Sequence, residues 1–357
     1  MLKRLVNECR FDFSIETKGP FIIREGRMPK SDKKKDDQKK EKTAPNSIPI
    51  RRVWHDNPKR DLIPSQSYYI PGTSLRGVMR SQVERIVRSS VTDRLLCCDP
   101  LRKQQGPEEG CSFWLDRQPN RGPKTGHAYK HSCVVCRLFG STGQASRIRV
   151  ADSADVLVPP QKMSYRDHIG IDRFTGGVCH RANFRDLVIE AGVSFKHTVS
   201  IRNFELWQLG LLAFLLRDFY CWEDGIVRMG YGKSKGYGLV QGVVGDITLT
   251  CYGRPDLASP PLLSDLGDEM SKEEREVYDL KPGGNKTIGD LQRCGGGFYH
   301  TIWKVSGNNA FWQAAAQAWL DRRDDFKSLD QLRASGAGEE QAAAAVPDLV
   351  AGTEEQP

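Results

Sequence analysis

The chain lacks any run of 18 apolar residues, and its N-terminal stretch, MLKRLVNECRFDF, lacks the apolar segment of a secretory signal peptide. The first absence argues against a membrane-spanning helix and the second against export. We therefore expect a cytoplasmic protein with no membrane partner. In that reducing compartment the ten cysteines are expected to be metal ligands or buried thiols, and not disulfides.

Two common phosphate-binding motifs are also missing, although residues 230–238 form a glycine-rich stretch, GYGKSKGYG. A P-loop would need glycine at Val227, and a dinucleotide-binding turn would need its third glycine one residue before Gly236. The stretch, called the Gly-Lys loop below, places Lys233 and Lys235 beside backbone that can approach a ligand closely and offer N–H groups to an anion. It is predicted to bind a polyanion backbone. A hairpin turn with exposed lysines is the alternative.

The formal net charge is +8, but its sign changes along the chain. Residues 251–357 hold 11 Lys/Arg against 18 Asp/Glu, which leaves 42 against 27 in residues 1–250, a surplus of +15. A surplus of this size is typical of proteins that bind nucleic-acid phosphates. Part of it lies in residues 28–47, a lysine-rich and aromatic-free segment that is predicted to be a disordered insertion with solvated lysines.

Hydrophobic patterning predicts an α+β fold, with a first domain over 1–252. Residues 3–16 alternate apolar and polar and predict a strand. One helix is expected to begin with Thr73 or Ser74 as its cap, and a second to span 204–219. Further strands are expected near 146–158, 186–202 and 239–249. The order strand–helix–strand–strand–helix–strand is that of ferredoxin-like folds and RNA-recognition motifs.

The remaining segments carry weaker patterns. Residues 90–135 are rich in Cys, Gly and Pro and are expected to be irregular. Residues 253–335 are predicted to be an acidic, loop-like C-terminal extension with one amphipathic helix near 308–333. Residues 336–357 are predicted to be a disordered tail.

A zinc-binding insertion is predicted over 95–137, where Cys133 and Cys136 form a CxxC pair. Four thiolates from separated parts of a loop suit tetrahedral Zn²⁺, which would order a region with little core of its own. The favoured ligands are Cys98, Cys111, Cys133 and Cys136. Cys97 or His131 is an alternative to Cys98. A redox CxxC is disfavoured because no thioredoxin-like βαβ pattern surrounds it.

Five phrases follow one another along the chain: IPGTSLRG at 70–77, CRLFGSTG at 136–143, IDRFTGG at 171–177, DLVIEAGVSF at 186–195 and the Gly-Lys loop. Together they resemble the RAMP superfamily, the repeat-associated proteins of CRISPR systems, and most closely the backbone subunit of type III effector complexes. The resemblance implies a ferredoxin-like palm that holds guide RNA, and a thumb hairpin, here within 160–200, that interrupts the guide–target duplex at regular intervals. It also implies a prokaryotic cytoplasmic complex in which further copies or other effector subunits stack along the guide.

The matching motifs supply candidate RNA contacts. A helix that begins in IPGTSLRG would present its N-terminus and Arg76 to phosphate. Arg173 is expected to bind the RNA backbone and Phe174 to insert between bases, with ordinary hairpin packing as the alternative for Phe174. The RNA-binding candidates are Ser74, Arg76, Arg80, Arg137, Ser141, Arg173, Phe174, Lys233, Ser234, Lys235 and Tyr237.

The resemblance also implies a catalytic residue. Nuclease members of the family cut target RNA with an aspartate in a loop ahead of the IPG motif, and Asp56, in Asp-Asn-Pro, matches that element. The implied reaction is attack of the ribose 2′-OH on the adjacent phosphorus, which leaves a cyclic phosphate and a 5′-OH. A carboxylate that recruits Mg²⁺ or another divalent cation is suited to this chemistry. His55 is a possible partner in proton transfer, and Asp61 is a second carboxylate within reach.

Three rival functions stay open on the sequence. The first is a scaffold of the same shape that holds guide RNA without cutting. The second is a guide-processing endoribonuclease, whose relatives share the palm and a glycine-rich loop but typically pair two such domains and end soon after the loop. The third is a zinc-stabilised RNA-binding module that uses no guide.

Overall fold

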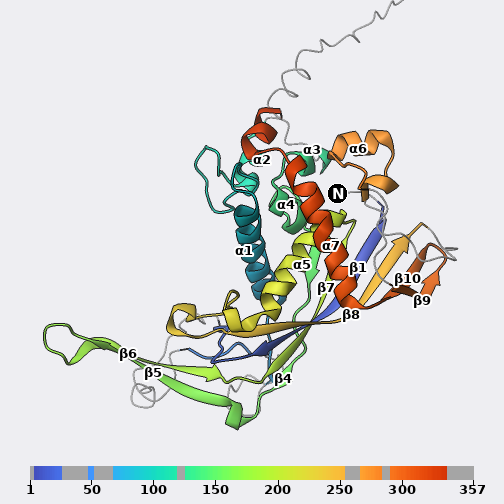
Figure 1. The fold of residues 1–357 in the computed structure, drawn as a ribbon. Helices are drawn as coiled ribbons and strands as arrows, with labels where there is room; N and C mark the ends of the chain where they lie inside the picture. The colour runs from blue at the N-terminus through green and yellow to red at the C-terminus, as the bar shows by residue number, and fades with distance from the viewer. Residues whose placement is uncertain are drawn as a thin grey trace, which may run out of the picture.

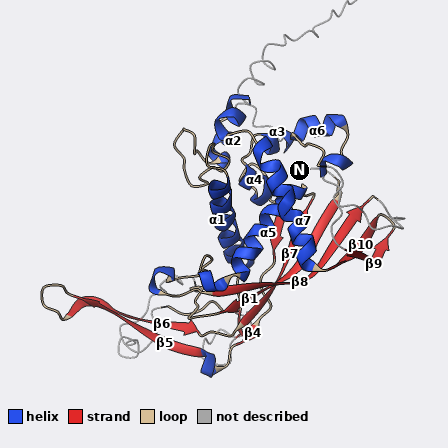
Figure 2. Ribbon diagram, in the orientation of Figure 1, coloured by secondary structure: helices blue, strands red, loops and turns tan. Residues whose placement is uncertain are grey.

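A computed structural model shows a mixed α/β protein in which helices pack against one face of a large antiparallel sheet (Figure 1, Figure 2). The described residues are 4–25, 47–51, 67–118, 125–253, 266–283 and 290–335. The predicted lysine-rich insertion, apart from Ser47, and the predicted tail therefore lie outside the described residues. Within the described part of the chain, no helix is long and apolar enough to cross a membrane.

Among the described residues the main sheet contains six strands in the order β3-β7-β1-β8-β10-β9, and every neighbouring pair is antiparallel. The strands are β1 (Asn7–Thr17), β3 (Ile148–Val150), β7 (Ser194–Arg202), β8 (Val240–Tyr252), β9 (Asp290–Gly297) and β10 (His300–Ser306). β1 confirms the predicted first strand. Its alternate residues Phe11, Phe13 and Ile15 are buried, so the period-2 pattern marks the face toward the core.

Three long helices cover that face: α1 (Gly72–Ser90), α5 (Leu206–Tyr220) and α7 (Asn308–Arg322). α5 packs against both α1 and α7 and against β8. Phe13 meets Phe219 of α5, and Phe11 meets Trp312 of α7, both edge to face with ring centroids 5.4 Å apart. The helix predicted over 204–219 is confirmed as α5.

The first turn of α1 differs from the prediction. Pro71 is the N-cap residue and no side chain caps the helix, so the expectation that Thr73 or Ser74 does so is wrong. The Gly72 N–H instead donates to Asp152 Oδ1 at 2.8 Å. A Cβ at Gly72 would lie 2.2 Å from a carbonyl oxygen of β3, so the close approach of helix and strand requires glycine.

The cysteine-rich segment is more regular than predicted. It forms three short helices, α2 (Cys111–Asp116), α3 (Thr125–Lys130) and α4 (Val134–Phe139). The expectation of an irregular segment over 90–135 is wrong at these turns. Each helix has six residues, too few for hydrophobic periodicity to distinguish a helix from a loop.

A separate two-stranded sheet projects from the body of the molecule (Figure 1). It pairs β5 (Met163–Ile171) with β6 (Val178–Ile189), inside the segment where the sequence predicts a thumb, and we call it the thumb hairpin. Two backbone hydrogen bonds of 2.8 Å between Phe21 and Ile189 fasten its base to the body. β2 (Ser67–Tyr68) and β4 (Val156–Leu157) form a further short pair.

Residues after β8 extend the same sheet. β10 pairs with β8 and β9 pairs with β10, so the sheet continues past residue 252, where the sequence placed a boundary. Trp303, Phe311 and Trp319 are buried in the same core as β1. The expectation of a loop-like segment with one helix over 253–335 is therefore wrong for β9 and β10, and also for α6 (Lys272–Tyr278).

Candidate functional site

Four cysteines from separate segments meet in the interior, and we call them the cysteine cluster. Cys98 lies in the loop after α1, Cys111 opens α2, Cys133 is the N-cap residue of α4, and Cys136 lies in the first turn of α4. All four are buried, and their Sγ atoms lie within 4.8 Å of one another. Among the described residues, no second group of three or more His, Cys, Asp or Glu side chains converges in this way.

The sulfur geometry fits a metal centre. Cys98 Sγ lies 3.7 Å from Cys136 Sγ and 3.6 Å from Cys133 Sγ. No disulfide joins any of the ten cysteines, all of which lie in the described residues. A disulfide needs about 2.0 Å, whereas four sulfurs bound at about 2.3 Å to a tetrahedral zinc lie about 3.8 Å apart. The cluster is compatible with structural zinc and contains the four residues that the sequence favoured.

The two alternative ligands make other contacts. Cys97 is buried beside the cluster, but its Sγ lies 3.4 Å from Cys98 O and does not join the converging sulfurs. His131 Nδ1 lies 2.9 Å from Leu332 O. Of the three candidates for this position, Cys98 is the one whose sulfur lies in the cluster.

Negative charge within the cluster is favoured on Cys133. Burial by itself would raise the pKa of this thiol, but hydrogen bonds from Cys111 and the other neighbouring cysteines outweigh burial and hold the pKa well below its usual value. The Cys136 backbone N–H also lies 3.3 Å from Cys133 Sγ. Hydrogen bonding to neighbouring thiols raises the pKa of Cys111 and Cys136. A bound metal ion would favour the thiolate form of all four.

The Gly-Lys loop is a tight turn that exposes its lysines. Lys233–Lys235 form a single 3₁₀ turn, and Lys233, Ser234 and Lys235 are exposed to solvent. The glycines at its two ends have φ between +75° and +91°, which a residue with a Cβ rarely adopts. These residues are Gly230, Gly232, Gly236 and Gly238. The glycines are therefore required by the backbone conformation of the loop, and the lysines provide its positive charge.

Tyr237 fastens the Gly-Lys loop to the thumb hairpin. This side chain, predicted to contact RNA, is buried, and its hydroxyl lies 2.6 Å from Nε2 of His168 on β5. The same nitrogen lies 3.2 Å from Oδ2 of Asp186, a fully buried carboxylate on β6. Lys235 Nζ lies 4.1 Å from the centroid of the Phe184 ring, on which His168 stacks. The lysines thus adjoin the middle of the hairpin, at the His168–Phe184 pair, on one continuous surface.

The segment that carries the predicted catalytic residue begins and ends beside this surface. Asp56, with its neighbours His55 and Asp61, lies outside the described residues. Its flanks are described: Arg51 and Tyr68 pair as an antiparallel bridge, so the two ends of the segment lie side by side. The backbone just ahead of the segment pairs with β6 of the thumb hairpin.

The far end of the thumb hairpin exposes Arg173 and Phe174. Asp172 Oδ1 accepts hydrogen bonds from the N–H groups of Thr175 at 2.8 Å and Phe174 at 2.9 Å, and these bonds lower the pKa of Asp172. They hold the turn in shape without covering its side chains. Phe174 is 99% exposed, so it does not pack against its own hairpin.

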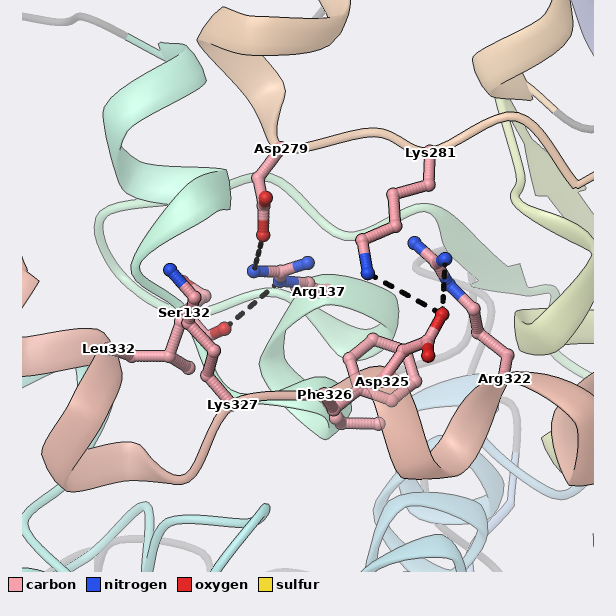
Figure 3. A pocket seen from close by; sticks show the side chains of 10 residues that line it. Ser132, Arg137, Asp279, Lys281, Arg322, Asp325, Phe326, Lys327 and Leu332 are labelled. Atoms are coloured by element: carbon pink, nitrogen blue, oxygen red, sulfur yellow. Dashed lines mark hydrogen bonds and ion pairs between the residues drawn. The ribbon is translucent and has the colours of Figure 1, made fainter.

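Arg137 is buried between α4 and the C-terminal segment (Figure 3). Its Nη2 lies 2.6 Å from Lys130 O and 3.2 Å from Asp279 Oδ2. In the same pocket Arg322 Nη1 lies 3.0 Å from Asp325 Oδ2. Arg137 is thus held by protein groups, and its predicted contact with RNA would require these bonds to break.

The other predicted contacts lie near α1 and α4. Arg76 and Arg80 reach from α1 to the C-terminal end of α4. Ser74 is partly exposed in the first turn of α1, and Ser141 is partly exposed in the turn after α4. The role of all four in RNA binding stays a prediction.

Sequence reasoning missed three residues where the hairpin and the Gly-Lys loop meet: His168, Asp186 and Arg24. The Arg24 guanidinium lies 4.6 Å from the centroid of the Tyr231 ring in the Gly-Lys loop. One signal was available, because Asp186 begins the apolar stretch DLVIEAG, where a buried carboxylate needs a partner. That partner, His168, lies on the opposite strand, and no local pattern connects the two.

Comparison with known families agrees with the motifs. The model of the RAMP superfamily matches residues 14–241, more than half of the chain. The chain therefore belongs to the RAMP superfamily, as the five motifs predicted. Membership suggests a CRISPR-associated role in RNA binding. No curated protein matches the chain.

Proposed function

We propose that the chain is a backbone subunit of a type III CRISPR effector complex, which binds guide RNA and cleaves the target RNA paired with it. One observation carries this proposal: the Gly-Lys loop, the thumb hairpin and the flanks of the Asp56 segment adjoin one another. Exposed Lys233 and Lys235 offer positive charge to a sugar-phosphate backbone. Phe174, exposed at the far end of the hairpin, offers an aromatic face to a base.

The order of the strands supports a ferredoxin-like palm. Without β9 and β10 the sheet reads β3-β7-β1-β8, and α1 and α5 provide the two helical connections between strands. We take these four strands and two helices as the palm. The thumb hairpin is then an insertion between β3 and β7, and β9, β10 and α7 are an addition at one edge.

In the proposed reaction the 2′-OH of a target nucleotide attacks its own 3′ phosphorus and the bond to the next 5′ oxygen breaks. One product ends in a 2′,3′-cyclic phosphate, and the other begins with a 5′-OH that has gained a proton. Asp56 is proposed to accept the 2′-OH proton or to hold a divalent cation such as Mg²⁺, which would neutralise charge on the phosphate. A base displaced by Phe174 would free its ribose for in-line attack.

The test compares Asp56→Ala with Asp61→Ala, a matched loss of one carboxylate from the same segment. Each variant is assembled with guide RNA and the other effector subunits and given end-labelled target RNA. Asp56→Ala is expected to lower the cleavage rate by about 100-fold or more while guide binding is unchanged, and Asp61→Ala to cleave like the wild type. Undiminished cleavage by Asp56→Ala would remove the catalytic assignment and leave the RNA-holding scaffold.

Two further measurements address the other rivals. Cleavage of a free repeat hairpin by the isolated chain would favour a guide-processing endoribonuclease. Sequencing of the RNA that co-purifies with the chain from cells separates a guide-holding subunit from a general RNA-binding module, because the former is expected to retain repeat-derived RNAs of defined length.

A further inference from the structure

The arginines of α1 divide between two sides of the helix. α1 carries Arg76, Arg80, Arg85 and Arg88. At 3.6 residues per turn, Arg76 and Arg80 share one face, whereas Arg85 lies half a turn away from Arg76. Arg85 Nη1 lies 3.4 Å from Gln82 Oε1 of the same helix. Three arginines of α1 instead donate to the segments that carry the cysteine cluster.

These three arginines donate to backbone carbonyl oxygens at the end of α4 or in the cluster, and to one cluster sulfur. Arg76 Nη2 donates to Phe139 O at the C-terminal end of α4. Arg88 Nη2 donates to the carbonyl oxygen of Cys98 at 3.1 Å. Arg80 donates through Nη1 to the carbonyl oxygen after α4, at 3.0 Å, and through Nη2 to Cys136 Sγ, at 3.2 Å.

Arg80 is oriented for this contact by a third bond. Its Nε donates to Glu84 Oε1 at 2.9 Å, and both side chains are largely buried, 19% and 13% exposed. Glu84 therefore holds one edge of the planar guanidinium, which leaves the terminal nitrogens directed at Cys136 and the end of α4. A fixed fork of this kind gives geometric specificity that a lysine cannot reproduce.

The charge of Arg80 suits a buried thiolate centre. Four thiolates around one Zn²⁺ carry a net negative charge, which is costly in the interior unless a cation or hydrogen-bond donors compensate it. Residues that orient metal ligands from outside the coordination sphere typically alter metal affinity about 10- to 100-fold. We propose that Arg80 is a positioning residue of the metal centre, holding the Cys136 thiolate and the end of α4, and that it does not contact RNA. The proposal rests on the cysteine cluster binding zinc.

The test compares Arg80→Gln with Arg85→Gln in the full chain loaded with zinc. Zinc release is followed with an excess of a colorimetric chelator at constant pH. Arg80→Gln is expected to release zinc about tenfold faster than the wild type, Arg80→Lys to show an intermediate rate, and Arg85→Gln to match the wild type. RNA affinity of the zinc-saturated variants is expected to stay unchanged.

A spectroscopic measurement keeps the proposal testable if Arg80→Gln folds poorly. Co²⁺ replaces Zn²⁺, and the sulfur-to-cobalt absorption band of Arg80→Lys is compared with that of Arg85→Lys. A band that shifts in the first variant and not in the second supports contact with Cys136. Equal release rates and equal bands, or a loss of RNA affinity with normal zinc release, would overturn the proposal. A wild-type chain that binds no zinc would instead disprove the metal centre itself and leave the RNA-binding function standing.

Discussion

His197 is a buried ionisable side chain in the centre of β7. Its Nδ1–H donates to Ala151 O at 2.9 Å, and within the described part of the chain Nε2 is buried without a hydrogen-bond partner. Burial lowers the pKa of His197, and the bond to Ala151 and the charge of Asp152 offset this only in part. A second proton would sit on a nitrogen that no acceptor faces, so the folded state favours the neutral ring.

We expect His197 to make the protein less stable at mildly acidic pH. The pKa of His197 is lower in the folded state than its value of about 6.5 in the unfolded state. The resulting stabilisation is therefore fully present above about pH 6.5 and decreases as the pH falls below about 6.5. The free energy of unfolding decreases by at most about 1.4 kcal/mol per pH unit. His197→Asn keeps a donor near the Nδ1 position and cannot titrate. Urea unfolding between pH 7.5 and 5 is expected to show a shallower pH slope for this variant than for the wild type. Equal slopes would contradict the assignment.

Side chains of the same type make different contacts in this protein, so residue identity alone does not predict which of them bind RNA. Arg173 and Lys233 are exposed, as a phosphate-binding role requires. Arg80 and Arg137 are also predicted RNA contacts, yet protein oxygens or sulfur accept hydrogen bonds from their guanidinium groups. The cysteines were easier to predict because zinc demands four thiolates together, which restricts the choice among ten residues. Arginine has no such requirement, so its role depends on burial that the sequence does not show.

The thumb hairpin is an element whose two ends have different structures. Its base is fixed by backbone pairing and its middle by the Tyr237–His168 contact, whereas its far end is a short turn held by Asp172. Its strands carry exposed apolar side chains, among them Tyr165 and Ile169. A hairpin that is fixed to the body of the molecule and exposed at its far end is suited to holding Phe174 at a constant distance from the palm.

Replacement of Phe174 tests this arrangement. Phe174→Ala is expected to leave the melting temperature unchanged, because the ring is fully exposed, and to weaken binding of a guide–target duplex by about 1–3 kcal/mol if a base stacks on it. Phe298→Ala is the matched control, since Phe298 is equally exposed in the turn between β9 and β10. Binding is measured by fluorescence anisotropy with labelled RNA. A similar loss in both variants would indicate a general effect of aromatic surface and not a specific contact.

Elements with a long, regular pattern were predictable, and the others were not. β1 has strong apolar–polar alternation and α5 is rich in leucine, and both were predicted, α5 to within two residues at each end and β1 with a start four residues too early. β9 was missed because it ends in three glycines, which weaken a strand pattern. β10 does alternate, with Thr301, Trp303 and Val305 buried, but it follows an acidic segment that resembles a loop. Its pairing with β8 depends on contacts distant in sequence.

The acidic C-terminal segment is joined to the basic part of the molecule at several points. Asp279 pairs with Arg137, and Glu274 lies 3.1 Å from the Arg4 guanidinium. Arg333 donates to three carbonyl oxygens in the loop between Cys98 and Cys111: those of Gly106, at 2.6 Å, Pro107, at 3.0 Å, and Glu109. Part of the acidic surplus thus pairs with arginines of this chain. Exposed pairs contribute little stability, so apolar packing of α7 on α5 must supply most of the attachment.

The crossing of α5 and α7 provides a test of that packing. A Cβ at Gly210 of α5 would lie 2.5 Å from Ala315 O and 2.7 Å from Trp319 Cβ of α7, so Gly210→Ala must separate the two helices. We expect it to destabilise the chain by about 1–3 kcal/mol, although alanine is the better helix former. Gly77→Ala, on α1 with nothing within 4 Å of the new Cβ, is expected to stabilise by about 0.5–1 kcal/mol. Urea unfolding of both variants without RNA measures the difference. If Gly210→Ala were as stable as the wild type, α7 would not be packed closely on α5, and the C-terminal segment would be an appendage of the palm, not part of its core.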